Sequence, residues 1–170
     1  MEFRIWYGED IESISQKEIN MWFDIYNNDL FEDRGYDITF MPVEEVEELY
    51  KRLKSEYVEY LMSLQEDPAF LFYVILENDY DMYVSHARVI TRDDLYYIEG
   101  LETHRDMYYK GYATSVIYKV CEIALQDNIK EVYANIYYLN EPSIKTFLKC
   151  GFQVISDPEN KRVTMKKRLV

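Results

Sequence analysis

The pattern of apolar side chains changes abruptly near Asp67-Pro68, and no other feature of the sequence constrains the fold as strongly. Before this point, apolar residues recur at helical spacing from Pro42 to about Gln65, which predicts a long amphipathic helix. After it, the segments FLFYVILE, MYVSHARVI and DLYYIEGLETH are rich in aromatic and β-branched residues and are separated by short polar turns. Three antiparallel strands fit these segments best. A chain with both patterns is expected to pack helices against a sheet.

The rest of the sequence adds helices and strands on both sides of this region. Ser15 followed by Glu18 is typical of a helix start, and apolar residues then recur at helical spacing up to Tyr26. Further helices are predicted at Gly111–Gln126 and Glu141–Lys149, and further strands at Phe3–Tyr7, Glu131–Tyr138, Phe152–Ile155 and Arg162–Leu169. We therefore expect an α/β fold in which helices flank a mixed, mostly antiparallel central sheet, in a single domain over residues 1–170.

Charge is divided unequally along the chain. The whole sequence has 19 basic and 32 acidic residues, a net charge of −13, which argues against a nucleic-acid backbone as the partner. Residues 1–100 hold 24 acidic and 8 basic residues, and residues 101–170 hold 8 acidic and 11 basic ones. This division favours a cationic ligand at the first part and an anionic one at the second. The alternative is that the acidic residues only solvate the surface.

Other features limit the cellular setting. The longest uninterrupted apolar run, Ala69–Leu76, is far shorter than the ~20 residues of a membrane-spanning helix, so no membrane association is expected. The first residues lack the apolar region of a secretory signal, which predicts a cytoplasmic protein. Cys121 and Cys150 are the only cysteines and have no metal-ligand spacing, so no metal site is predicted.

A turn between a predicted strand and a predicted helix is the first candidate for chemistry. The strand LYYIEGLETH leads through RDMYYKGYAT into an amphipathic helix. Unpaired backbone N–H groups and the positive end of the helix dipole make such a helix start a site for phosphate groups. Gly111 and Ala113 have side chains too small to block a pyrophosphate. The turn is neither a P-loop nor a dinucleotide-binding fingerprint.

A second motif, NEPSIKTFLKCGF, follows some thirty residues later, and with both motifs the chain resembles the GNAT superfamily of N-acetyltransferases. In that family, Gln/Arg-x-x-Gly-x-Gly/Ala holds the pyrophosphate of acetyl-CoA, and the equivalent residues here are Tyr108 to Ala113. The preceding strand usually ends in Leu-x-Val, which corresponds to Leu101, Glu102 and Thr103. The family's Asn-x-x-Ala/Ser-Ile-x-Phe-Tyr-x-x-x-Gly-Phe corresponds to residues 140–152, with Leu148 in place of the tyrosine.

The resemblance implies acetyl-CoA as co-substrate and a bulged strand that separates from its neighbour to admit the pantetheine arm. The cofactor-binding residues that it implies are Leu101, Glu102, Thr103, Tyr108, Tyr109, Lys110, Gly111, Tyr112, Ala113, Thr114, Asn140, Ser143 and Phe147. Tyr108 departs from the family's Gln or Arg, which removes a polar side chain but none of the backbone donors.

The implied reaction is transfer of an acetyl group to an amine, which must first lose a proton. Relatives often place a base on the strand before the pyrophosphate turn, where this chain has Glu99, with Tyr97 on the same face. The alternative is that Glu99 forms only a cross-strand ion pair. Leucine cannot donate a proton, so Leu148 leaves the departing thiolate without its usual donor. Tyr137, the adjacent Tyr138 and water are the candidates for that step.

The acceptor is expected to enter past the irregular segment 29–41, where Phe31, Glu32 and Tyr36 offer acidic and aromatic contacts. These contacts suit a cationic small molecule or a peptide amine. Two other hypotheses stay open: a GNAT-fold protein that binds or senses acyl-CoA with little turnover, and an interaction domain whose acidic helix docks a basic partner. The sequence leaves the oligomeric state open between monomer and homodimer.

Overall fold

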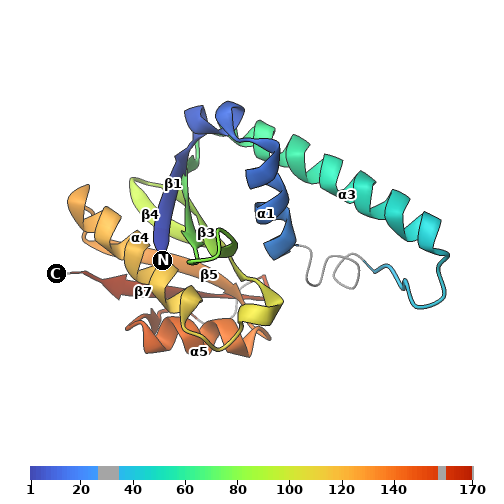
Figure 1. Ribbon diagram of the computed structural model, residues 1–170. Helices are drawn as coiled ribbons and strands as arrows, with labels where there is room; N and C mark the ends of the chain where they lie inside the picture. Colours follow the sequence, from blue (N-terminus) through green and yellow to red (C-terminus); the bar gives the residue numbers. More distant parts are fainter. Residues whose placement is uncertain (27–34, 157–159, 170) are drawn as a thin grey trace.

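The computed structural model describes residues 1–26, 35–156 and 160–169, in which helices cover both faces of one seven-stranded sheet (Figure 1). In chain order the strands are β1 (Glu2–Tyr7), β2 (Phe70–Glu77), β3 (Tyr83–Arg92), β4 (Leu95–Thr103), β5 (Glu131–Tyr137), β6 (Gln153–Val154) and β7 (Arg162–Arg168). The α-helices are α1 (Gln16–Tyr26), α3 (Val43–Ser63), α4 (Tyr112–Gln126) and α5 (Glu141–Lys149), and the short 3₁₀ helices are η1 (Gly8–Ser13), η3 (Leu64–Glu66) and η4 (Arg105–Met107). No helix among the described residues is both long and apolar enough to cross a bilayer.

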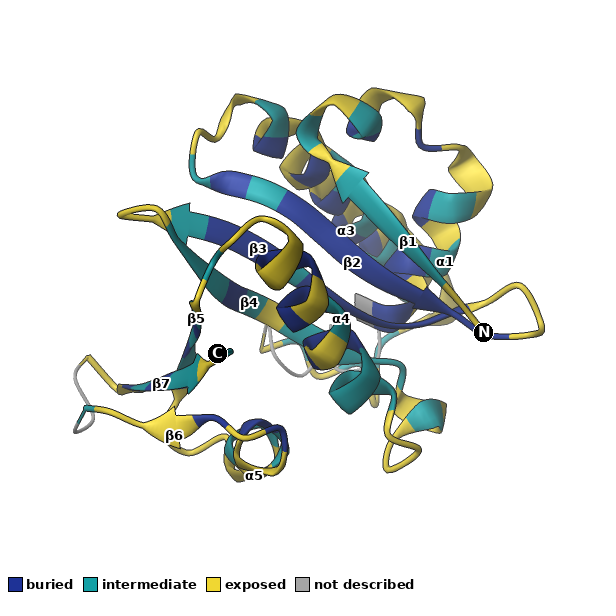
Figure 2. Ribbon diagram, turned by 90° about the vertical axis from the view of Figure 1, so that its left-hand side faces the viewer, coloured by how far each residue is buried: buried dark blue, intermediate teal, exposed yellow. Residues whose placement is uncertain are grey.

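The strands lie in the order β1-β2-β3-β4-β5-β7-β6, and all neighbours are antiparallel except β4 and β5. This arrangement confirms the predicted mixed, mostly antiparallel sheet. The central strands β2 and β3 are buried between the helix layers, whereas the short edge strand β6 is exposed (Figure 2). The predicted helix from Pro42 is also confirmed, and the first half of α3 extends away from the sheet (Figure 1).

Each face of the sheet has its own core. On one face, Trp22 and Phe23 of α1 pack with Leu53, Tyr57 and other residues of α3 against the sheet. The opposite face is covered by α4 and α5, which fill a second core with small aliphatic side chains and with the buried ring of Phe147. Burying these apolar side chains contributes most of the stability of such a fold. The sheet is therefore held rigidly from both sides.

The sheet is interrupted between β4 and β5. Their parallel pairing is limited to three residue pairs, the last being Ile98 with Ala134. Just beyond, the register of β4 against β3 shifts, because Arg88 lies opposite Glu99 but His86 lies opposite Glu102. Gly100 has a φ of +56° at this bulge, a conformation that residues with a Cβ rarely adopt. The predicted bulge and the separation of the two strands are thus both present.

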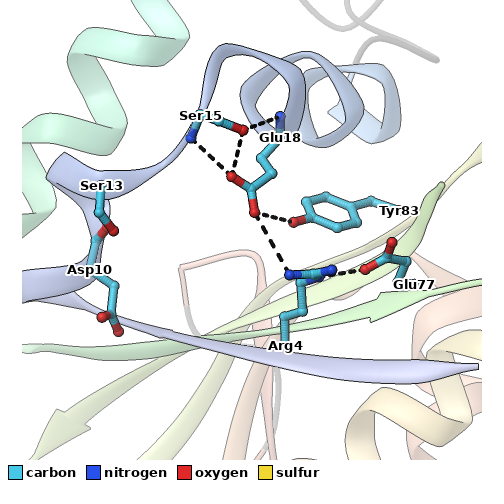
Figure 3. A network of polar contacts seen from close by, with 7 residues as sticks. All are labelled: Arg4, Asp10, Ser13, Ser15, Glu18, Glu77 and Tyr83. Carbon is cyan, nitrogen blue, oxygen red and sulfur yellow. Dashed lines mark hydrogen bonds and ion pairs between the residues drawn. The ribbon is translucent and has the colours of Figure 1, made fainter. Parts of the chain in front are cut away.

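A polar network holds the first helix against the sheet (Figure 3). Glu18 accepts hydrogen bonds from the Ser15 N–H and hydroxyl at 2.9 and 2.6 Å, which is the capping box predicted from the sequence. The other carboxylate oxygen of Glu18 accepts from the Tyr83 hydroxyl and lies 3.8 Å from the Arg4 guanidinium. Arg4 in turn pairs with Glu77. Glu18 therefore both starts α1 and connects it to β1 and β3.

We expect Glu18→Ala to lower the free energy of unfolding at pH 7 by about 1–2 kcal/mol, because it removes a helix cap and its cross-element contacts. Burial opposes ionisation of Glu18, but the Ser15 hydrogen bonds and Arg4 hold its pKa below the ordinary value. Its contribution is therefore complete above the unfolded pKa of ~4.3 and is lost as the pH falls through the lower folded value. Urea denaturation of wild type and variant at pH 7 and pH 3 measures this loss.

The exposed Glu59→Ala on α3 serves as the control for that measurement and should change the stability by less than ~0.5 kcal/mol. If the difference between wild type and Glu18→Ala were the same at both pH values, the charge of Glu18 would have no part in holding α1.

Candidate active site

A cleft of about 940 Å³ opens where β4 and β5 separate. Its walls come from both sides of the sheet interruption and from the starts of the two helices that follow. The lining residues are Ile25 of α1; Ile98, Glu99, Gly100, Leu101, Glu102 and Thr103 of β4; Met107, Tyr108, Tyr109, Gly111, Tyr112, Ala113 and Thr114 around the start of α4; Asn135, Ile136 and Tyr137 of β5; Asn140, Pro142, Ser143, Thr146, Phe147 and Lys149 around α5; and Arg162 of β7.

The start of α4 forms one end of this cleft. Gly111 is the N-cap residue with a φ of +84°, and the first hydrogen bond of the helix runs from the Ser115 N–H to the Gly111 carbonyl at 3.0 Å. No hydrogen bond between described residues uses the N–H groups from Gly111 to Thr114. A Cβ at Gly111 would meet no atom within 4 Å, so the backbone is open to a ligand there. These donors, together with the helix dipole, fit a pyrophosphate.

Only some side chains of the turn before α4 line the cleft. Tyr108 and Tyr109 line the cleft, and Tyr109 has a φ of +62°, which is uncommon for a residue with a large side chain. The Lys110 ammonium donates to the Asp106 carbonyl at 3.1 Å instead, and Lys110 is not part of the cleft lining. The turn therefore offers the cleft backbone donors and aromatic rings rather than the lysine charge.

Part of the β4 wall lies beyond the pairing of this strand with β5. Leu101, Glu102 and Thr103 follow the last pairing with β5, so their backbone edge on that side faces the cleft. On the other side β4 stays joined to β3, where the Ser85 hydroxyl donates to the Glu102 carbonyl at 2.7 Å. An extended ligand between the strands could pair with this edge as an additional strand does.

The opposite wall is formed by the start of α5. The Asn140 side chain accepts a hydrogen bond from the Ser143 N–H at 3.1 Å, so it caps the helix while it also lines the cleft. Phe147 lines the cleft as well and is otherwise buried. Leu148, the residue that replaces the family's tyrosine, is half exposed and lies outside the lining. A proton donor must therefore come from elsewhere.

Glu99 lies in the cleft wall and also forms a cross-strand ion pair, the alternative to its role as a base. Its two carboxylate oxygens accept hydrogen bonds from Arg88 and Arg92, each at 2.7 Å. Tyr97, predicted to share its site, does not line the cleft but stacks on Tyr133 with ring centres 5.1 Å apart. Both oxygens of Glu99 are thus engaged within the protein.

Tyr137 is the predicted residue best placed to give up a proton. It stands at the end of β5, lines the cleft and keeps 42% of its surface exposed. Its neighbour Tyr138 contacts it edge to face with ring centres 5.3 Å apart, but is not part of the lining. The Tyr137 side chain carries a phenol hydroxyl, which is a hydrogen-bond donor.

Of the predicted acceptor residues, Tyr36 alone lies within the described part of the chain, and it does not line this cleft. Phe31 and Glu32 lie outside the described residues. Tyr36 lines a separate hollow of about 370 Å³ at the start of α3, where its hydroxyl accepts a hydrogen bond from Arg52 at 2.8 Å. Ile25, near the end of α1, does reach the cleft.

Sequence reasoning missed several lining residues. Lys149 and Arg162 bring positive charge to the cleft, and the basic excess of residues 101–170 was the signal that could have found them. Asn135 and Ile136 were missed because nothing in a strand sequence says which residues lose their partner strand. Among the described residues, no three side chains of His, Cys, Asp or Glu lie together in a way that could hold a metal ion.

Comparison with solved structures finds the same fold in distant proteins. The PaiA N-acetyltransferase of Thermoplasma acidophilum, solved with coenzyme A, has a TM-score of 0.63 at 15% identity, and the match covers 99% of each chain. An acetyltransferase of Thermus thermophilus has a TM-score of 0.64 at 14% identity, covering 99% of this chain and 97% of that one. The ribosomal-protein-S18-alanine N-acetyltransferase of Escherichia coli has a TM-score of 0.60 at 11% identity, covering 99% and 94%.

A search of curated proteins found no match to the chain. The model of the acetyltransferase (GNAT) family, in contrast, matches residues 21–152, which include the whole of the cleft lining except Arg162. The match spans well over half of the chain, and the chain belongs to the acetyltransferase (GNAT) family.

Proposed function

We propose that this acetyl-CoA-dependent acetyltransferase passes its acetyl group directly to a primary amine while both substrates are bound, and that the amine belongs to a cationic small molecule or a peptide. The free backbone N–H groups at the start of α4, at one end of a cleft between separated strands, are the observation that carries the proposal. They fit the pyrophosphate, and the edge of β4 beyond its pairing with β5 fits the pantetheine arm.

The amine must lose a proton before it can attack. An alkyl amine with a pKa of ~10.4 is almost fully protonated at pH 7, and freeing its lone pair costs roughly 4 to 5 kcal/mol. Most of the rate enhancement over the uncatalysed reaction is expected to come from holding the amine nitrogen near the thioester carbonyl. Glu99 stays a predicted base, although an ammonium ion would compete with two guanidinium groups for its oxygens.

The proposed cationic character of the acceptor rests on charge. The first 100 residues carry a net charge of −16, and they include α1, which ends beside the cleft. A negative surface raises the local concentration of a cation and speeds its arrival. The acceptor's identity is tested by measuring thiol release from acetyl-CoA with polyamines, aminoglycoside-type amines and peptide amines, and with neutral amines as controls. Faster release with neutral amines would contradict the cationic assignment.

A second function has one observation in its favour. Leu148 cannot protonate a thiolate and lies outside the cleft, so the protein could bind acyl-CoA with little turnover. Binding of acetyl-CoA without thiol release for any amine would support this second function, and it would contradict the transferase proposal.

We expect Gly111→Glu to abolish binding of acetyl-CoA, because it puts negative charge and bulk at the pyrophosphate turn. Gly151→Glu is the matched control: Gly151 also has a positive φ, +87°, but lies outside the cleft lining, so the backbone strain is similar. Each replacement is expected to cost about 1–2 kcal/mol of stability. Calorimetric titration with acetyl-CoA should show heat for Gly151→Glu and none for Gly111→Glu. Equal binding by both variants would remove the start of α4 from the cofactor site.

We expect Tyr137→Phe to lower kcat by about 100-fold with little change in the KM for acetyl-CoA, because the thiolate loses its proton donor. Tyr138→Phe removes the adjacent hydroxyl, which does not line the cleft, and should leave kcat unchanged. Steady-state thiol release measures both variants. Wild-type turnover in Tyr137→Phe would exclude this hydroxyl and leave water as the donor.

A further inference from the structure

The lining of the cleft includes residues from both faces of the sheet. Ile136 of β5 and Val163 of β7 belong to the core beneath α4 and α5. Because side chains alternate along a strand, Asn135, Tyr137 and Arg162 extend from the opposite face, the one on which α1 lies. All three also line the cleft. They therefore form a wall on the side of the sheet away from the pyrophosphate turn.

This part of the α1 face is open. Helix α1 packs on β3 and β4, and among the described residues the core beneath α1 and α3 includes none from β5 or β7. Arg162 is exposed, and Tyr137 keeps 42% of its surface exposed. A second substrate can therefore reach these residues without crossing the side of the cleft that fits the coenzyme.

The register of β5 and β7 places a set of hydrogen-bond donors together. Tyr137 lies opposite Arg162, and Asn135 lies opposite Thr164. The Thr164 hydroxyl donates to Oδ1 of Asn135 at 2.9 Å, which fixes the orientation of the amide and leaves its NH₂ group as a donor. Nη1 of Arg162 donates to the backbone carbonyl of Asn135 at 3.3 Å, so the guanidinium is held beside the same residue.

Arg162 differs from other cations on this face of the sheet. Lys166 and Arg92 each pair with a carboxylate on a neighbouring strand, at 3.2 and 2.7 Å. Arg162 forms no ion pair with a described residue, and only one of its five N–H donors is used for the Asn135 carbonyl. A planar fork of N–H groups matches the two oxygens of a carboxylate. The pair of Asn135 and Arg162 thus offers donors that lack a matching acceptor in the described part of the chain.

We propose that Asn135 and Arg162 bind a carboxylate of the acceptor, which is then an amino acid or a short peptide whose amine and carboxylate lie a few bonds apart. This inference rests on the proposed acetyl transfer to an amine. Arg162 lies opposite Tyr137, the proposed proton donor, so a carboxylate bound there stays close to the reacting groups. The ammonium group keeps the proposed cationic character, and the carboxylate accounts for a positive charge on the acceptor side of the cleft.

Amino acids and the amines that remain after loss of their carboxyl group are matched probes. Lysine is compared with cadaverine, ornithine with putrescine, and short lysine peptides with a free C-terminus are compared with their amidated forms. We measure kcat/KM for thiol release from acetyl-CoA. The carboxylate member of the best pair should be at least about 10-fold better, because it gains hydrogen bonds between charged groups.

Arg162→Gln removes the charge from the proposed carboxylate site. We expect kcat/KM for the carboxylate member to fall by about 10- to 100-fold, while the member without a carboxylate changes by less than about 2-fold and the KM for acetyl-CoA stays the same. Arg168→Gln is the matched control, because Arg168 is exposed on the same face of β7 but lies outside the cleft lining. This control should keep the wild-type preference.

Asn135→Asp tests the second donor. The variant keeps an oxygen for the Thr164 hydroxyl but replaces the NH₂ group with a negative oxygen, which repels a carboxylate and also competes for Arg162. We expect at least a 10-fold loss, roughly, for the carboxylate member only. Asn128→Asp adds the same charge at an exposed turn outside the cleft and is the control. Acetyl-CoA should still raise the melting temperature of both variants, which shows that the coenzyme site is folded.

The outcomes separate this inference from the proposed function. Equal or faster turnover without the carboxylate in every pair, or turnover confined to amines that lack one, would overturn the carboxylate site while the transferase function stands. An equal loss for both members in Arg162→Gln, or a rise in the KM for acetyl-CoA alone, would overturn it as well. A wild type that binds acetyl-CoA but releases no thiol with any amine would overturn the proposed function, and this inference with it.

Discussion

The early end of strand pairing between β4 and β5 is the constraint on which the site depends. Backbone N–H and C=O groups must be paired or solvated, so two neighbouring strands that separate leave an edge open to a ligand. Gly100 makes the separation possible, because its positive φ admits an extra residue into β4 without a steric penalty. The helix layers on both faces keep the gap from closing, since closing it would disturb two packed cores.

The gap has different chemistry on its two faces. The start of α4 provides N–H groups and the positive end of a helix dipole, which suit the diphosphate of the coenzyme. The opposite face carries the carboxylates of β4 and the end of α1, which suit an amine. The proposed transfer of an acetyl group to an amine needs this division, because the two substrates must meet from different sides. The uneven distribution of charge along the sequence reflects this arrangement.

Local signals in the sequence predicted much of the fold. The capping box of Ser15 and Glu18, the long helix from Pro42 and the strands after Asp67 form where expected, because each depends on neighbours within a few residues. Gly111 was identified for the same reason, since a helix start can be read locally. Tyr97 shares the predicted face with Glu99, but alternation along a strand does not show that Tyr133 of β5 stacks on it and that it lies outside the cleft lining.

By itself, the sequence determined the fold class, the family and the turn that we propose binds a pyrophosphate, because these follow from periodicity and from short motifs. Only the tertiary structure decided how each polar side chain is used. Arg88 and Arg92 engage Glu99, while His86 and Trp22 lie behind Glu102, and these contacts join residues from 7 to 64 positions apart in the chain. The strength and role of a carboxylate depend on such neighbours, which strand register and helix packing bring together.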